Sequence, residues 1–143
     1  MPVRFENSYP VEGGNFSEAG KVSVEIKNAL KKLGISNNIQ RRAAIAAYES
    51  EMNIIAHATR GTLTVRVTLD AVHIDVKDAG PGIGDVGLAI KEGCSTAADQ
   101  FQRMGFGAGM GLSNIRDCSD TFEVVSGSHG GTHLKIVINT NER

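Results

Sequence analysis

The chain has 143 residues, the size of one compact domain, so we expect a single domain over residues 1–143. Its formal net charge of -1 gives no positive field that could hold DNA or RNA. No apolar run approaches a membrane span and the two cysteines fit no disulfide scaffold, so we expect a cytoplasmic protein without nucleic-acid or membrane partners. Glycine is the unusual component: there are 17, about 12% where about 7% is typical, and nine of them lie between residues 80 and 111.

The amino-terminal part of the chain predicts one strand and one helix. A short strand is expected over residues 3–7, closed by a loop that contains Pro10. Apolar residues at helical spacing then predict a helix that Ser17 caps. It should end near Leu33, because Gly34 is a typical helix stop.

A second helix should begin after residues 36–38 and extend to about His57. Its apolar stripe consists of Ile45, Tyr48, Met52 and Ile55. On another side of the helix Glu49, Asn53 and His57 repeat every four residues, so they stand one above the other. Polar groups on an alanine-rich, mostly buried helix are costly unless something satisfies them, which makes this row a candidate site.

After Gly61 the hydrophobic period changes from helical to alternating. Two antiparallel strands are predicted over residues 62–69 and 72–76, and the second delivers the chain to Asp78. Beyond it we expect a short helix over 85–92, a flexible stretch over 93–107 and a helix over 109–117. Strands over 122–126 and 132–139 should form a final hairpin.

Three segments carry chemistry: Glu49-x-x-x-Asn53 on a helix, Asp-Ala-Gly-Pro-Gly-Ile over 78–83, and Gly-Phe-Gly-Ala-Gly-Met-Gly-Leu over 105–112. A glycine-rich stretch that opens a helix suits phosphate, because unpaired backbone N–H groups converge there. The sequence contains neither a P-loop nor the His-Arg-Asp and Asp-Phe-Gly motifs of eukaryotic-type kinases. The dinucleotide-binding pattern also lacks its preceding strand and acidic residue. A phosphate-binding loop of another fold is therefore predicted.

Together with Gly131-Thr132 before the last strand, these motifs resemble the ATP-binding fold shared by gyrase B, MutL and the histidine kinases. Within that superfamily, the short chain and residues 91–96 are most similar to the bacterial anti-sigma-factor and switch-protein serine kinases. The resemblance implies an α/β two-layer sandwich. Its mixed, mostly antiparallel sheet would carry helices on one face, and a glycine-rich lid would cover ATP.

The resemblance also implies roles for individual residues. Glu49 would be the catalytic base, and Asn53 would hold the Mg²⁺ that bridges the phosphates of ATP. Asp78 would accept a hydrogen bond from the adenine amino group, with Thr132 at the back of the same pocket. The other ATP-binding positions would be Gly80, Gly82 and Ile83 beside the base, and Gly105, Gly107, Ala108, Gly109, Met110, Gly111 and Leu112 around the phosphates. Glu51 lies two positions from Glu49 and should face elsewhere.

The activity implied by the resemblance is that of an ATP- and Mg²⁺-dependent serine/threonine protein kinase in partner-switching control of transcription. Its partners would be a sigma factor or regulator complex and a small anti-sigma antagonist that receives the phosphate, and such proteins often form homodimers. Two alternatives stay open. One is a non-catalytic ATP-binding interaction module, and the other is the ATP-binding part of a split histidine kinase.

Overall fold

The structure, a computed structural model, describes residues 3–78, 111–126 and 132–140. In chain order the described elements are β1 (Phe5–Glu12), the short 3-10 helix η1 (Phe16–Glu18), α1 (Lys21–Lys32), α2 (Asn37–His57), β2 (Arg60–Val67), β3 (Ala71–Asp78), α5 (Gly111–Cys118), β4 (Thr121–Ser126) and β5 (Thr132–Asn139). The helix predicted over 85–92, the stretch over 93–107 and most of the glycine-rich lid lie outside the described residues.

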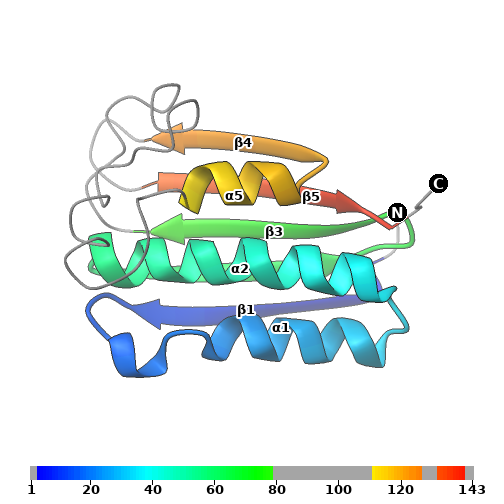
Figure 1. Ribbon diagram of the computed structural model, residues 1–143, viewed down its shortest axis with the longest axis horizontal. Coiled ribbons are helices and arrows are strands. Elements are labelled where there is room, and N and C mark those ends of the chain that lie inside the picture. Colours follow the sequence, from blue (N-terminus) through cyan, green and yellow to red (C-terminus); the bar gives the residue numbers. More distant parts are fainter. Residues whose placement is uncertain (1–2, 79–110, 127–131, 141–143) are drawn as a thin grey trace.

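The strands form one sheet in the order β1-β2-β3-β5-β4. Every pairing of the described strands is antiparallel, so the mixed sheet that we expected is purely antiparallel over this part of the chain. Figure 1 shows two layers, with α1, α2 and α5 lying across the same face of the sheet. The predicted α/β sandwich with helices on one face is confirmed.

The core lies between the helices and the sheet. Side chains alternate across the sheet along each strand, and one set is buried under the helices while the other faces away. The buried set includes Leu63, Val65, Val67, Val72, Ile74, Val76, Leu134, Ile136 and Ile138. In the helical layer α2 packs between α1 and α5. None of the described helices is both long enough and apolar enough to cross a membrane.

The start of the first helix differs from the prediction. α1 begins at Lys21, after Gly20, whose φ of 93° places it in the left-handed region. Ser17 lies earlier, in η1, and its hydroxyl donates to Oδ1 of Asn15 at 3.0 Å, so it does not cap α1. The predicted stop is confirmed: Gly34 has a φ of 77°.

Proline in the first strand also departs from the prediction. β1 does not end before Pro10 but continues through it to Glu12, with Pro10 opposite Thr62 of β2. β1 is an edge strand of the sheet, and at an edge a missing N–H need not cost a hydrogen bond between strands. The rule that proline ends a strand therefore does not apply here.

The turn between β2 and β3 begins earlier than predicted, so the strand expected over residues 62–69 is shorter at its end. β2 ends at Val67, and the hydroxyl of Thr68 then accepts from the backbone N–H groups of Asp70 and Ala71, at 3.3 and 3.2 Å. Leu69 therefore lies in a turn rather than in a strand, and it is 61% exposed.

α2 has nearly its predicted bounds. The side chain of Ser36 caps it by accepting from the N–H of Ile39 at 3.4 Å. Its predicted stripe is only partly right, because Met52 and Ile55 are buried whereas Ile45 and Tyr48 are half-buried. α2 has packed neighbours on three sides, and four of its fully buried positions hold small residues, namely Ala43, Ala46, Ala47 and Ser50.

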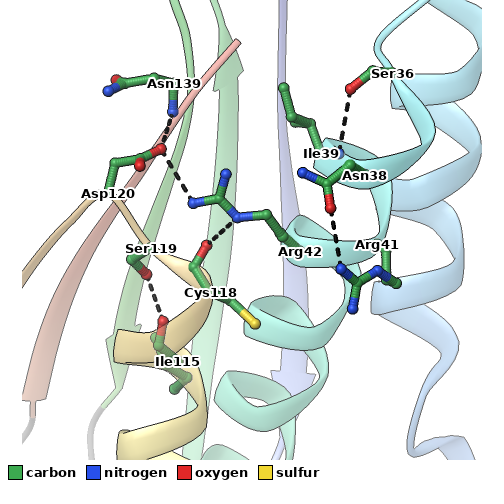
Figure 2. A network of polar contacts seen from close by, with 10 residues as sticks. All are labelled: Ser36, Asn38, Ile39, Arg41, Arg42, Ile115, Cys118, Ser119, Asp120 and Asn139. Atoms are coloured by element: carbon green, nitrogen blue, oxygen red, sulfur yellow. Dashed lines mark hydrogen bonds and ion pairs between the residues drawn. The ribbon is translucent and has the colours of Figure 1, made fainter. Parts of the chain in front are cut away.

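A polar network ties the amino-terminal half of α2 to the end of α5 and to β5 (Figure 2). Nε of Arg42 donates to the carbonyl oxygen of Cys118 at 3.0 Å, and its Nη2 lies 3.2 Å from Oδ2 of Asp120. The same Asp120 oxygen accepts from the backbone N–H of Asn139 at 2.7 Å. One arginine thus joins three elements that are distant in the sequence.

Candidate functional site

Several elements end or begin toward the same end of the sandwich. At the left of Figure 1 lie the last turns of α2, the end of β3 and the starts of α5 and β5. The register of β3 and β5 places Asp78 directly opposite Thr132. The two residues expected to contact adenine are therefore neighbours on adjacent strands, although 54 residues of sequence separate them. Asp78 is half-buried. A cavity of about 510 Å³ beside it is also lined by Pro10, Thr62 and Lys77, which are on the sheet face opposite to the helices, so it does not open toward Glu49 and Asn53.

Gly61 lets α2 lie close to this end of the sheet. It stands opposite Asp78 in the register of β2 and β3. A Cβ at this position would lie 2.7 Å from Cδ1 of Ile54 and 2.8 Å from the carbonyl oxygen of Lys77, which is closer than real Cβ contacts. The sequence showed Gly61 only as the point where the period changes. A glycine inside a strand is nevertheless the signal that indicates a close approach.

Glu49 lies on the side of α2 that faces α5. Its Oε1 accepts from Nδ2 of Asn114 at 3.4 Å, and the side chain is half-buried. Burial raises the pKa of Glu49, and the hydrogen bond from Asn114 only partly offsets this effect. A carboxylate with a raised pKa is a better proton acceptor than one with its ordinary value. Asn114 was not predicted, because no spacing within α5 marks it as a partner of α2.

Asn53 follows Glu49 by one helical turn and is also half-buried. Among the described residues no group of three or more His, Cys, Asp or Glu side chains could hold a metal ion. Mg²⁺ bound to a nucleotide usually takes only one or two protein oxygens, because phosphates and water supply the rest. A single amide oxygen on a helix, close to one carboxylate, fits that mode of binding. The side chain of His57, the third member of the row, lies outside the described part.

The start of α5 is the described part of the predicted phosphate loop. Gly111 is its first residue, and Leu112 is buried in the core with 1% of its surface exposed. Leu112 therefore anchors the first turn, where backbone N–H groups have no partner within the helix. The remaining predicted positions lie outside the described residues and stay predictions: Gly80, Gly82, Ile83, Gly105, Gly107, Ala108, Gly109 and Met110.

Glu51 faces away from Glu49, as predicted. Only 2% of its surface is exposed, and its Oε2 accepts from the backbone N–H of Val22 at 3.4 Å, on the α1 side of α2. The two carboxylates of α2 therefore lie on opposite sides of one helix. Glu49 and Asn53 share the side that faces α5, whose first two residues are the end of the predicted phosphate loop.

Comparison with known proteins agrees with this geometry. The chain is similar to the serine/threonine-protein kinase RsbT of Bacillus subtilis (strain 168), with 28% identity over 115 residues, which are 78% of this chain and 80% of that protein. The family model described as histidine kinase-, DNA gyrase B- and HSP90-like ATPase matches residues 26–142, which include α2, all the glycine-rich segments and the last hairpin. The match, the antiparallel sheet and the one-sided helical layer lead to one conclusion: the chain belongs to this ATPase family.

Proposed function

We propose that the protein is a serine/threonine protein kinase that transfers the γ-phosphoryl group of ATP to a hydroxyl of a small partner protein. The observation that carries the proposal is Glu49, a half-buried carboxylate with a raised pKa that stands one turn before Asn53. The similarity to RsbT, a serine/threonine-protein kinase by name, supports the same reaction. Membership of the ATPase family alone would not distinguish transfer of the phosphate to water from transfer to a protein hydroxyl.

In the proposed reaction Glu49 accepts the proton of the attacking hydroxyl while the bond between that oxygen and the γ-phosphorus forms and the bond to the β-phosphate oxygen breaks. Asn114 donates to Glu49 and holds its carboxylate toward α5. Asn53 supplies an amide oxygen to Mg²⁺, which when bound neutralises the negative charge of the phosphates. Backbone N–H groups at the start of α5 would hydrogen-bond the phosphates, and Asp78 with Thr132 would receive the base.

The proposed partners are a sigma factor or regulator complex and a small anti-sigma antagonist that carries the acceptor hydroxyl. A homodimer of the chain is compatible with this scheme. Phosphorylation would decide which partner the antagonist binds, because it adds about two negative charges at one position of a docking surface.

The test is to incubate the protein with labelled ATP and a candidate small anti-sigma antagonist from the same organism. We expect label on the partner that survives acid, because phosphoserine and phosphothreonine are acid-stable whereas phosphohistidine is not. Acid-labile label would instead show the ATP-binding part of a split histidine kinase. If nothing is labelled and Glu49→Ala leaves nucleotide-dependent partner binding intact while Asn53→Ala abolishes it, the protein is a non-catalytic interaction module.

A further inference from the structure

A second cavity lies on the opposite side of α2 from Glu49. It has a volume of about 460 Å³. Its walls come from β1, the segment around η1, the first turns of α1 and the last turns of α2. Tyr9, Val22 and Ile55 form an apolar part of its wall. Its size is within the range of small-molecule sites, and it shares no lining residue with the Glu49–Asn53 side of α2.

Glu51 forms part of the wall of this cavity and has an unusual hydrogen-bonding state. Its side chain is almost completely buried, and its Oε2 accepts from the N–H of Val22 in the first turn of α1. The N-cap residue of α1 is Gly20, which has no side chain to satisfy that turn, so Glu51 does so from the neighbouring helix. The other oxygen, Oε1, is also buried and has no hydrogen-bond donor among the described residues.

A buried carboxylate oxygen without a donor is a rare and unfavourable arrangement. The charges around the cavity indicate which kind of group would relieve it. Glu12 of β1, Glu18 of η1 and Glu25 of α1 line the cavity together with Glu51. Lys21 is the basic residue in the wall, and its Nζ already lies 3.7 Å from Oε2 of Glu18. The lining therefore carries an excess of negative charge, which excludes an anionic ligand.

A divalent metal does not fit this cavity either. Within the described part of the chain, no three carboxylate, thiol or imidazole groups come close enough to coordinate an ion. The apolar wall instead suits a ligand that carries a hydrocarbon segment beside its charge. An alkyl chain ending in a guanidinium or ammonium group combines the two properties.

We propose that the cavity between α1 and α2 binds such an organic cation, with Glu51 as its counter-ion. Because Oε1 is buried, the carboxylate of Glu51 would turn slightly to meet the donor, while it continues to accept from the start of α1. The cation has two sources in a cell: the side chain of an arginine or lysine on a partner protein, or a free alkyl amine or guanidine. Either source would place its charge two residues from Glu49, across the same helix.

The protonation of Glu51 gives the proposal a pH dependence. Burial raises the pKa of Glu51, with a smaller contribution from the negative charge of Glu25, while the backbone N–H groups of α1 lower it. A cation favours the ionised carboxylate, so its affinity should increase as the pH rises through that pKa. The other charged groups that face the cavity are Glu12, Glu18 and Lys21.

The experiment is an NMR titration of the full chain that follows the amide signals of Gly20, Val22 and Ser23. The probes are butylguanidinium, for a free cation, and the peptide acetyl-Gly-Arg-Gly-amide, for a protein side chain. A peptide with norleucine in place of arginine is the uncharged control. We expect saturable shifts with at least one cationic probe and none with the norleucine peptide. The tighter of the two cationic probes identifies the source.

The Glu51→Gln variant should weaken binding of that probe at least tenfold, since the amide keeps an acceptor for Val22 but loses the charge. Glu6→Gln, a change of an exposed carboxylate on β1, should leave the affinity unchanged. Shifts that do not saturate, or equal affinity in wild type and Glu51→Gln, would overturn the proposal. If Glu51→Gln does not fold, the affinity of wild type for the same probe is measured between pH 4 and 7. An affinity that is independent of pH contradicts a role for Glu51. None of these readouts requires phosphoryl transfer, so they stand apart from the test of kinase activity.

Discussion

The two ends of α2 differ in how their polar side chains are satisfied. Near the amino terminus of α2, Ser36 caps the helix, Gln40 donates to the carbonyl oxygen of Ile35 at 2.7 Å, and Arg42 joins α5 and β5. Near the carboxyl terminus, Glu49 has one contact at 3.4 Å and Glu51 has an oxygen without a donor among the described residues. The first end is built for stability. The second leaves two carboxylates with few partners among the described residues, which is the arrangement expected of the ligand-binding end proposed above.

Replacing Glu49 by glutamine should have the largest effect, and that effect should be on phosphoryl transfer. The amide keeps the shape and still accepts from Asn114, but it cannot take a proton. We expect phosphoryl transfer to the partner to fall about 10²–10⁴-fold, with little change in ATP affinity. Single-turnover transfer from labelled ATP measures the rate. Glu123→Gln, at an exposed position of β4, is the matched control, and equal rates in the two variants would contradict the proposed base.

Replacing Arg42 by methionine tests the other end of α2. The carbonyl oxygen of Cys118 loses a charged donor, so we expect the free energy of unfolding to fall by about 1–2 kcal/mol. The ion pair with Asp120 adds little to this value, because both side chains are partly exposed. Urea unfolding measures the loss, and nucleotide affinity should not change. Arg41→Met is the control: its exposed side chain bonds only to Asn38 among the contacts described, so a loss as large as that of Arg42→Met would refute the network's contribution.

The capping of α2 can be compared with the cap that was predicted for α1. Ser36→Ala removes the acceptor for the N–H of Ile39, and we expect it to lower the free energy of unfolding by about 1 kcal/mol. Ser17→Ala removes a hydroxyl that, within the described part of the chain, bonds to the side chain of Asn15, so its effect should be close to zero. Thermal or urea unfolding of both variants measures the two losses. A larger loss of stability in Ser17→Ala than in Ser36→Ala would show that Ser17 is a helix cap after all.

The smallest effect concerns pH. Burial raises the pKa of Glu49 above its usual value of 4.5, so the fold favours the protonated side chain. The stability that this proton contributes is complete below about pH 4.5 and is lost as the pH rises through the raised pKa. Glu49→Gln has no such proton. Wild type should therefore become less stable relative to the variant from pH 4 to 7, as measured by urea unfolding, whereas parallel pH profiles would show that Glu49 is not desolvated in solution.

The sequence was sufficient to predict the bounds of an element where the signals for its start and end lie within that element. The bounds of α2 follow from Ser36 and the helical period, and β5 has its predicted bounds because alternation and Thr132 mark its start. The motif Glu49-x-x-x-Asn53 lies on one helix face by geometry alone. For the same reason the family could be recognised from motifs that are each short and local in the sequence.

Features that depend on a neighbouring element could not be predicted. α1 begins after Gly20, and Glu51 of another helix accepts from the N–H of Val22 in its first turn, which no residue near Ser17 reveals. The contact of Asn114 with Glu49 likewise depends on how α5 packs against α2. Proline in β1 is acceptable only because that strand lies at the edge of the sheet, which the local sequence does not show.

The position of Pro10 has a consequence for the behaviour of the protein at high concentration. An edge strand offers unpaired N–H and C=O groups to any other strand, and this is a common route to aggregation. Pro10 has no N–H to offer along β1, and the exposed charges of Glu6 and Glu12 stand on the same strand. A second chain therefore cannot extend the sheet there with a regular ladder, so Pro10 protects this edge against fibre-like growth.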